Sequence, residues 1–187
     1  MLNDDIFTRC SEINDKLNEG CVSEARAMVI KLLDCLEKDN DSYMPLINHL
    51  VREVGLYPYM NPETSNWEDR FAYEAFKTDI GEDKKYALHL DQSLVLKRLL
   101  LGDSIAVSAP TSFGKSFIID AYIAIKRPNI VVDIVPTVAL ADETRRRLTH
   151  KFGDEYKIIT TTEATVAKKS IFVFPQEGEF AYLQILE

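Results

Sequence analysis

A phosphate-loop pattern between a strand-like run and a helical run constrains the fold of this chain more than any other feature. The eight residues Ala109-Pro-Thr-Ser-Phe-Gly-Lys-Ser116 have the form (Ala/Gly)-x4-Gly-Lys-(Ser/Thr). They follow the apolar run Ile105–Ala109 and precede a helical pattern over residues 115–126. This is the context in which main-chain amides hold nucleotide phosphates. We therefore expect an α/β nucleotide-binding unit around this loop.

Each part of the loop has an expected role. The backbone N–H groups of residues 112–116 and the helix N-terminus supply positive potential for the β-phosphate. Gly114 lets the backbone approach the phosphates, and Lys115, the expected catalytic residue, places a cation between the β- and γ-phosphates. The Ser116 hydroxyl joins the coordination of Mg²⁺. The predicted ATP-binding residues of the loop are Ala109, Pro110, Thr111, Ser112, Phe113, Gly114, Lys115 and Ser116.

Helical patterns alternate with short apolar runs from residue 86 onward. The expected helices cover residues 91–101, 115–126 and 139–151, with a last one from about residue 178. The expected strands cover residues 105–109, 130–135, 156–160 and 171–174. This alternation indicates right-handed βαβ units in a parallel sheet covered by helices. The predicted fold class is α/β over residues 86–187, preceded by an all-α unit over residues 1–85.

The N-terminal unit shows four helical patterns. They run from Asn3 or Asp4 to Gly20, from Ser23 to about residue 38, from Pro45 to Gly55, and from Ser65 to Phe76. Residues 57–62 contain two prolines and predict an extended connection. In the fourth helix we expect Ser65 as the cap of a capping box and Trp67, Phe71 and Phe76 as the apolar face. Together with Tyr57, Tyr59 and Tyr73, these residues form an aromatic cluster that is either core between the helical unit and the α/β unit or a surface that binds a partner protein.

Charge and composition exclude several classes of protein. The chain has 187 residues, is 46% hydrophobic and carries a net charge of −8, with −9 in residues 1–94 and +1 in residues 95–187. The neutral second half can approach phosphates, whereas the acidic whole argues against general polyanion binding. No apolar run reaches the roughly 18 residues of a membrane span, and the acidic start is unlike a signal peptide. We expect no membrane contact and a cytoplasmic protein with reduced cysteines.

Two further features suggest which ligands this unit binds. Gln92 starts the helix before the first expected strand, and its amide offers the donor and acceptor that adenine requires. Pro136 and Thr137 end the strand 130–135 and start a helix that carries three successive arginines, Arg145 to Arg147. A threonine at such a strand end, with the following helix amides, can hold nucleic-acid phosphates. The expected nucleic-acid contacts are Pro136, Thr137 and Arg145, although a salt-bridged surface is an equal alternative for the arginines.

In order, Gln92, SAPTSFGKS (108–116), PTVALADE (136–143) and VFPQE (173–177) resemble the Q motif and motifs I, Ia and Ib of superfamily 2 helicases of the DEAD/DEAH-box type. The resemblance covers about residues 86–187. It implies a RecA-like first motor lobe, ATP and Mg²⁺ as cofactors, and nucleic acid, DNA rather than RNA, as the partner. INHLVREVGLYPYM (47–60) and WEDRFAYEAF (67–76) resemble the helical lead-in of anti-phage defence helicases. Of these, the helicase subunit of the Hachiman system is the most similar, which implies a nuclease partner subunit.

A complete helicase motor also needs an Asp-Glu pair after a later strand and a second lobe. No acidic pair in residues 1–187 follows an apolar strand. We therefore expect the N-terminal fragment of a larger motor, inactive by itself. Two alternatives stay open. Asp133, within the strand 130–135, would serve as a magnesium ligand in a stand-alone kinase-type enzyme, and residues 1–80 would act as a non-catalytic partner-binding module.

Overall fold

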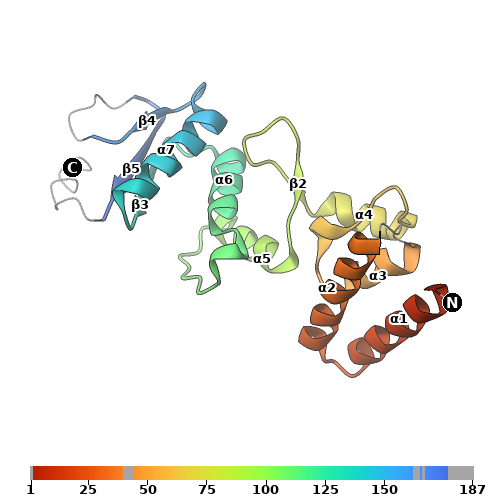
Figure 1. Ribbon diagram of the computed structural model, residues 1–187. Coiled ribbons are helices and arrows are strands. Elements are labelled where there is room, and N and C mark those ends of the chain that lie inside the picture. Colours follow the sequence, from red (N-terminus) through yellow and green to blue (C-terminus); the bar gives the residue numbers. More distant parts are fainter. Residues whose placement is uncertain (1, 40–43, 162–164, 166, 177–187) are drawn as a thin grey trace. The chain divides into compact units, whose positions relative to one another are not determined.

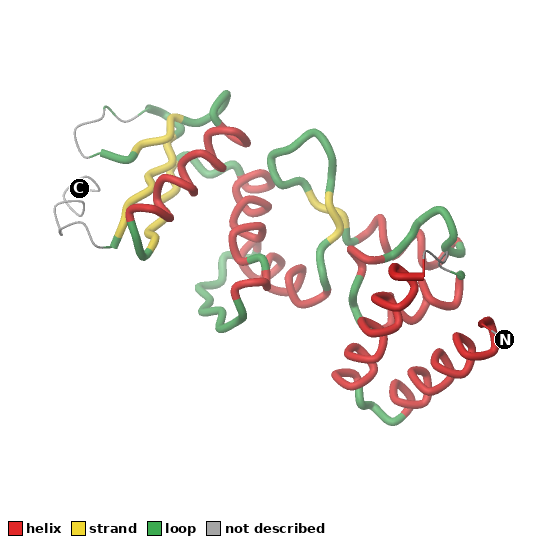
Figure 2. Tube along the Cα trace, in the orientation of Figure 1, coloured by secondary structure: helices red, strands yellow, loops and turns green. Residues whose placement is uncertain are grey.

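The computed structural model describes residues 2–39, 44–161, 165 and 167–176. The chain divides into two compact units (Figure 1). The first is formed by Met1–Thr78 and Lys85–Phe113, the second by Asp79–Lys84 and Gly114–Glu187. The predicted class is confirmed: N-terminal helices are followed by a parallel sheet with flanking helices (Figure 2). The division into domains at residues 85 and 86 stays a prediction.

The first unit is mainly helical. Its helices are α1 (Leu2–Asn18), α2 (Val22–Asp39), α3 (Pro45–Glu53), α4 (Trp67–Ala75) and α5 (Leu90–Leu100), with short 3-10 helices η1 (Tyr57–Tyr59) and η2 (Thr111–Phe113). A two-residue antiparallel ladder pairs β1 (Lys77–Thr78) with β2 (Tyr86–Ala87). The core consists of apolar side chains from α1, α2, α3 and η1, among them Ile13, Val29, Leu36, Ile47 and Leu50. In the described part of the chain, no helix combines the length and apolar character of a membrane span.

The second unit contains the parallel sheet. Its elements are α6 (Lys115–Lys126), β3 (Ile130–Val135), α7 (Val138–Phe152), β4 (Lys157–Ile159) and β5 (Ser170–Pro175). The strands lie in the order β3-β5-β4, and Val131 pairs with Ile171 in the parallel register. The apolar faces of α6 and α7 pack on β3 and β5 in one core that includes Ile123, Leu148 and Val173. The boundaries predicted from the sequence for these three strands agree with the observed boundaries to within one residue.

Two predicted elements, the strand 105–109 and the extended connection 57–62, differ from the structure. Residues 105–109 do not form the expected strand, and Val107 is exposed. A strand needs hydrogen-bonded partners, and none of the described residues pairs with this run. The proline-containing segment predicted to be extended forms η1 at its start, since proline is well tolerated in the first turn of a helix. The helix predicted from residue 178 lies outside the described residues.

The expected apolar face of α4 is wrong. Trp67 is 76% exposed and Phe71 73% exposed, whereas Phe76 stacks on the buried Tyr57 with ring centroids 3.7 Å apart. The cap is also one residue later than predicted, because the side chain of Asn66 accepts the hydrogen bond from the Asp69 N–H. This cap leaves the buried carboxylate of Asp69 beside the Arg52 guanidinium, at 3.0 Å, so α4 buries a charged pair rather than two aromatic rings.

Candidate functional site

The phosphate loop forms an exposed turn followed by a helix start. The N–H of Phe113 donates to the carbonyl of Pro110 at 3.1 Å and closes η2. Gly114 has φ +79° and is the N-cap of α6, a conformation that side chains with a β-carbon rarely adopt. Lys115 and Ser116 are the first two residues of α6 and are exposed. The predicted loop-to-helix geometry is therefore present, with the amides of the first helical turn at its tip.

Gln92 is joined to this loop by its side chain. It is only 8% exposed, its Nε2 donates to the carbonyl of Phe113 at 2.8 Å, and its Oε1 accepts from the His89 N–H at 2.9 Å. The amide thereby ties the start of α5 to the phosphate loop. An amide side chain can donate two hydrogen bonds and accept two, and these contacts account for one of each. Recognition of adenine by Gln92 stays a prediction.

The residues at the start of α6 fit a magnesium nucleotide. The Ser116 side chain supplies a hydroxyl oxygen, a hard ligand of the kind that Mg²⁺ prefers. No cluster of three His, Cys, Asp or Glu side chains that would hold a metal occurs among the described residues. Coordination of Mg²⁺ by Ser116 and the phosphate oxygens of a nucleotide stays a prediction.

The predicted nucleic-acid segment lies at the carboxyl edge of the sheet. β3 and β5 end side by side, with Val135 opposite Pro175, and the Gln176 N–H donates to the Val135 carbonyl at 2.7 Å. Pro136 and Thr137 follow and are exposed. The Thr137 hydroxyl oxygen caps α7 by accepting from the Leu140 N–H at 3.2 Å, which leaves its own proton for a phosphate oxygen. Residues 173–176 of the VFPQE motif therefore lie beside the end of β3 at this edge, and Glu177 lies outside the described residues.

The three arginines of α7 point to two different places. Arg145 and Arg146 both pair with the carboxylate of Asp142, with Arg145 Nη2 at 2.7 Å, and their hydrogen bonds lower the pKa of Asp142. Arg147 instead contacts the buried carboxylate of Asp120 on α6. The salt-bridged surface that the sequence analysis left open is therefore present for Arg145 and Arg146, while the contact of Arg145 with nucleic acid stays a prediction.

Asp133 lies in the interior of β3 and not at a strand end. Burial raises the pKa of its carboxyl, the Arg147 charge partly offsets this, and the Asp120 charge adds to it. This environment disfavours the charged carboxylate, which is the form that binds Mg²⁺. The kinase-type interpretation of Asp133 gains no support from this placement.

Sequence reasoning missed an ion-pair network in the second unit. The side chain of Asp120 is 2% exposed and receives Arg147 on one oxygen and Lys151, at 3.1 Å, on the other. Lys151 also pairs with Glu82 at 2.9 Å. A signal for it exists, because Asp120 is the one charged residue in the apolar run FIIDAYIAI, residues 117–125. Buried carboxylates of this kind require cationic partners.

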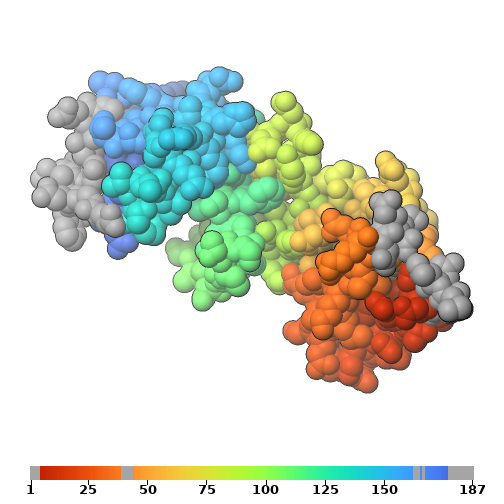
Figure 3. Space-filling model, viewed as in Figure 1, coloured from red at the N-terminus to blue at the C-terminus, as the bar shows by residue number. Residues whose placement is uncertain are grey.

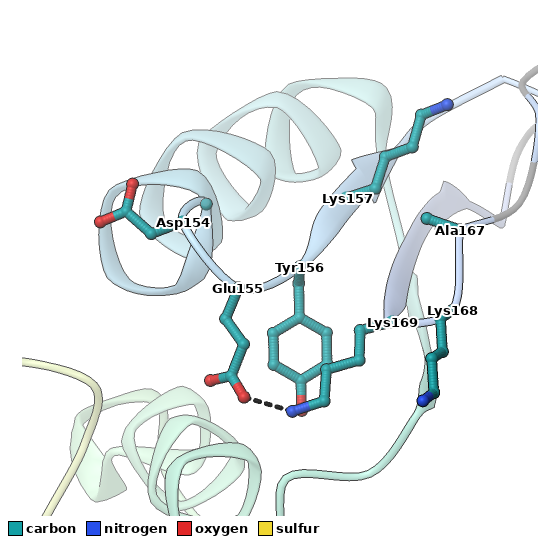
Figure 4. A pocket seen from close by; sticks show the side chains of 8 residues that line it. Asp154, Glu155, Tyr156, Lys157, Ala167, Lys168 and Lys169 are labelled. Atoms are coloured by element: carbon teal, nitrogen blue, oxygen red, sulfur yellow. Dashed lines mark hydrogen bonds and ion pairs between the residues drawn. The ribbon is translucent and has the colours of Figure 1, made fainter.

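A cavity of about 540 Å³ lies at the opposite edge of the sheet, where β4 and β5 begin (Figure 4). Its lining includes Lys157, Lys168 and Lys169, and the Lys169 ammonium pairs with the Glu155 carboxylate. In open parallel sheets ligands bind at the carboxyl ends of the strands. This cavity at the amino ends is therefore separate from the segment that follows β3.

Comparison with known proteins identifies two families along the chain. Residues 89–175 match the DEAD/DEAH box helicase family. Residues 1–70 match the N-terminal domain of anti-bacteriophage protein B. Over 155 residues the chain is 34% identical to "Anti-bacteriophage protein B" of Escherichia coli (strain K12), an alignment that covers 81% of this chain and 21% of that protein. No solved structure matches the chain.

The match over residues 89–175 agrees with the helicase resemblance at the level of a DEAD/DEAH box helicase domain. The chain spans about a fifth of the length of that relative. The finer resemblance to the helicase subunit of the Hachiman system stays a prediction.

Proposed function

We propose that this chain, with its DEAD/DEAH box helicase domain, supplies the nucleotide-binding part of an ATP-dependent nucleic-acid motor used in anti-phage defence. The observation that carries the proposal is the exposed start of α6, where Gly114 turns the chain and Lys115 and Ser116 open the helix. Its N–H groups, its partial positive charge and the Lys115 ammonium suit the β- and γ-phosphates of ATP. Turnover requires further elements of a motor, so the activity belongs to the full-length protein.

The carboxyl edge of the sheet supplies the second half of the proposal. Pro136, Thr137 and the first amides of α7 hold phosphates of a DNA strand, and the exposure of residues 136–140 supports this role. When bound, Mg²⁺ neutralises the charge that develops on the phosphates. Within this chain, Lys115 orients the phosphates, Ser116 holds the ion, and Gln92 reads the adenine. The protein acts in the cytoplasm.

The second candidate function, partner docking by the helical unit, is favoured by one observation. Trp67 and Phe71 stand one turn apart on α4 and are both largely exposed. Exposed aromatic pairs of this kind are enriched where proteins bind one another. The occupant predicted from the sequence is a nuclease subunit. Pull-down of that subunit by the full-length protein and by the Phe71→Ala variant tests this role, and equal recovery contradicts it.

Lys115→Ala in the full-length protein tests the main proposal. We expect DNA-stimulated ATP hydrolysis to fall by about 100-fold or more, since the cation on the developing phosphate charge is lost. Lys126→Ala is the matched control, because Lys126 is an exposed lysine at the other end of the same helix. Undiminished hydrolysis in Lys115→Ala contradicts the proposal, and equal loss in both variants shows that the assay reports damage to α6.

A further inference from the structure

We propose that Arg147 is a positioning residue that couples nucleic-acid binding at the start of α7 to the phosphate-binding turn at the start of α6. The inference rests on the proposed function. It concerns the two helices α6 and α7 of the second unit, labelled in Figure 1 and seen from the surface in Figure 3. Arg147 joins them through two contacts on the same face of α6.

The first contact reaches the turn that is expected to bind the phosphates. Nη1 of Arg147 lies 3.4 Å from the backbone carbonyl oxygen of Ser116 and also contacts the carboxylate of Asp120. Ser116 and Asp120 are four residues apart and therefore lie one above the other on α6. A single guanidinium thus contacts the first turn of α6 at Ser116 and the next turn at Asp120.

A second residue of α7 also pairs with Asp120 and limits the directions in which α7 can move. Lys151, one turn after Arg147, holds the other oxygen of Asp120 at 3.1 Å and is itself paired with Glu82. Residues on two successive turns of α7 therefore form ion pairs with one buried carboxylate. A displacement of α7 along or about its axis has to change both ion pairs at once. Ser116 in the phosphate-binding turn and Asp120 one turn later belong to the same helix, so the phosphate-binding turn moves with α7.

The energetics favour positioning over stability as the role of this network. Asp120 is 2% exposed and Lys151 9%, so both charges lose most of their hydration on folding. Buried ion pairs of this kind commonly contribute no more to stability than well-packed apolar residues of the same volume. Such a pair instead fixes one relative placement of the two helices, since the buried Asp120 carboxylate keeps both cations only in that placement.

α7 is a suitable connecting element. Thr137 caps it at the edge where nucleic acid is proposed to bind, and Arg147 lies about 15 Å further along at 1.5 Å per residue. Phosphates that bind at Thr137 and the following amides pull on the start of α7. Because the helix is continuous through Phe152, this displacement arrives at Arg147 and changes the position of Ser116.

Steady-state ATP hydrolysis by the full-length protein tests the coupling with Arg147→Met, Arg147→Lys and the control Arg146→Ala. Met keeps most of the length of the side chain without its charge, and Arg146 is an exposed neighbour that pairs only with Asp142 among the described residues. At saturating single-stranded DNA, we expect Arg147→Met to lower the stimulation of kcat about tenfold. The KM for ATP and the half-saturating DNA concentration change by less than about twofold, and Arg147→Lys restores part of the stimulation.

Two results overturn the inference. The first is that DNA stimulates the kcat of Arg147→Met as strongly as that of the parent protein. The second is that Arg147→Lys and Arg147→Met lose the stimulation of kcat to the same extent, which indicates a role in packing alone. If Arg147→Met does not fold, as judged by thermal melting, Asp120→Asn decides, because it keeps the shape and weakens both ion pairs. A stimulation of kcat by DNA in Asp120→Asn that equals that of the parent protein overturns the inference too. Failure of the proposed function is separate, because Lys115→Ala then leaves hydrolysis intact.

Discussion

The Nε2 of Gln92 donates to the carbonyl oxygen of Phe113 at 2.8 Å, which ties the first turn of α5 to the residue just before Gly114. The two residues are 21 positions apart in the chain. A nucleotide that occupies the loop therefore meets a glutamine whose orientation is already fixed. In the proposed function, in which Gln92 binds adenine, this preorganisation lowers the entropic cost of binding.

Substitution of Gln92 tests that relationship. Gln92→Ala in the full-length protein removes the tie and the adenine contact, and we expect the KM for ATP to rise about tenfold, as for the loss of one to two hydrogen bonds. The preference for ATP over GTP falls in parallel. Gln92→Glu is the matched variant, because it keeps the acceptor for the His89 N–H and loses only the donor. Steady-state hydrolysis of both nucleotides measures this, and an unchanged ATP:GTP ratio in both variants removes Gln92 from the site.

Exposure of the aromatic residues on α4 predicts small effects on stability. Trp67→Ala and Phe71→Ala should each change the free energy of unfolding by about 0.5 kcal/mol or less, as at most surface positions. Leu50→Ala in the core of the same unit should cost about 2–5 kcal/mol. Urea denaturation of the three variants compares them. A cost for Trp67→Ala similar to that for Leu50→Ala contradicts the exposure of this ring.

The local signals of the second unit were sufficient to predict most of its elements. Residues 115–126 and 130–135 have strong periodicity or β-rich composition, and both form the expected elements. The run 105–109 has the same composition, yet it is unpaired, because composition cannot supply a neighbouring strand. Contacts between elements were equally beyond prediction. Arg147 reaches Asp120 across 27 positions, a pairing that depends on how α6 and α7 cross.

In the first unit, the periodicity of apolar residues predicts the helices correctly but predicts the wrong buried face for α4. The spacing of Trp67 and Phe71 fits an inward stripe on α4 as well as it fits an outward one. The buried Asp69 decides between them, because Arg52 on α3 pairs with its carboxylate and turns that side of α4 inward. A buried aspartate is contrary to ordinary burial preferences, so the sequence offered no reason to expect it.

The raised pKa of Asp133 predicts that Asp133→Asn stabilises the folded protein to an extent that depends on pH. Burial raises the pKa of its carboxyl above the ordinary 3.8, so the folded state holds the proton more tightly than the unfolded state. The associated stability is present below pH 3.8 and is lost as the pH rises through the raised pKa. Asp133→Asn keeps the neutral form at every pH. We expect a higher melting temperature than the parent at pH 7 and a difference that shrinks as the pH approaches 4.

Thermal melting at several pH values, combined with ATP hydrolysis, separates the two roles of Asp133. A lower melting temperature of Asp133→Asn at pH 7 contradicts the burial account. Loss of hydrolysis by a well-folded Asp133→Asn full-length protein would instead restore the kinase-type interpretation, in which this carboxylate binds Mg²⁺.

Salt dependence tests Arg145 as a nucleic-acid contact. Arg145 already shares Asp142 with Arg146, so a DNA phosphate would have to displace or join that pair. If Arg145 contacts one phosphate, Arg145→Ala should lower the slope of log K against log salt concentration by about 0.7 for single-stranded DNA. Fluorescence anisotropy of the full-length protein at several salt concentrations measures the slope. Equal slopes for Arg145→Ala and the parent mean that Arg145 belongs to the protein surface alone.

Hydrogen–deuterium exchange of the full-length protein, with and without Mg²⁺ and a non-hydrolysable ATP analogue, tests the central claim most directly. The main-chain amides of residues 112–116 bind the phosphates in this account, so their exchange should slow in a peptide that spans residues 109–118. Lys115→Ala should abolish that protection at the same nucleotide concentration. Nucleotide binding that leaves the exchange of this peptide unchanged, and protects instead the lysine-lined cavity at the start of β4 and β5, would contradict the account.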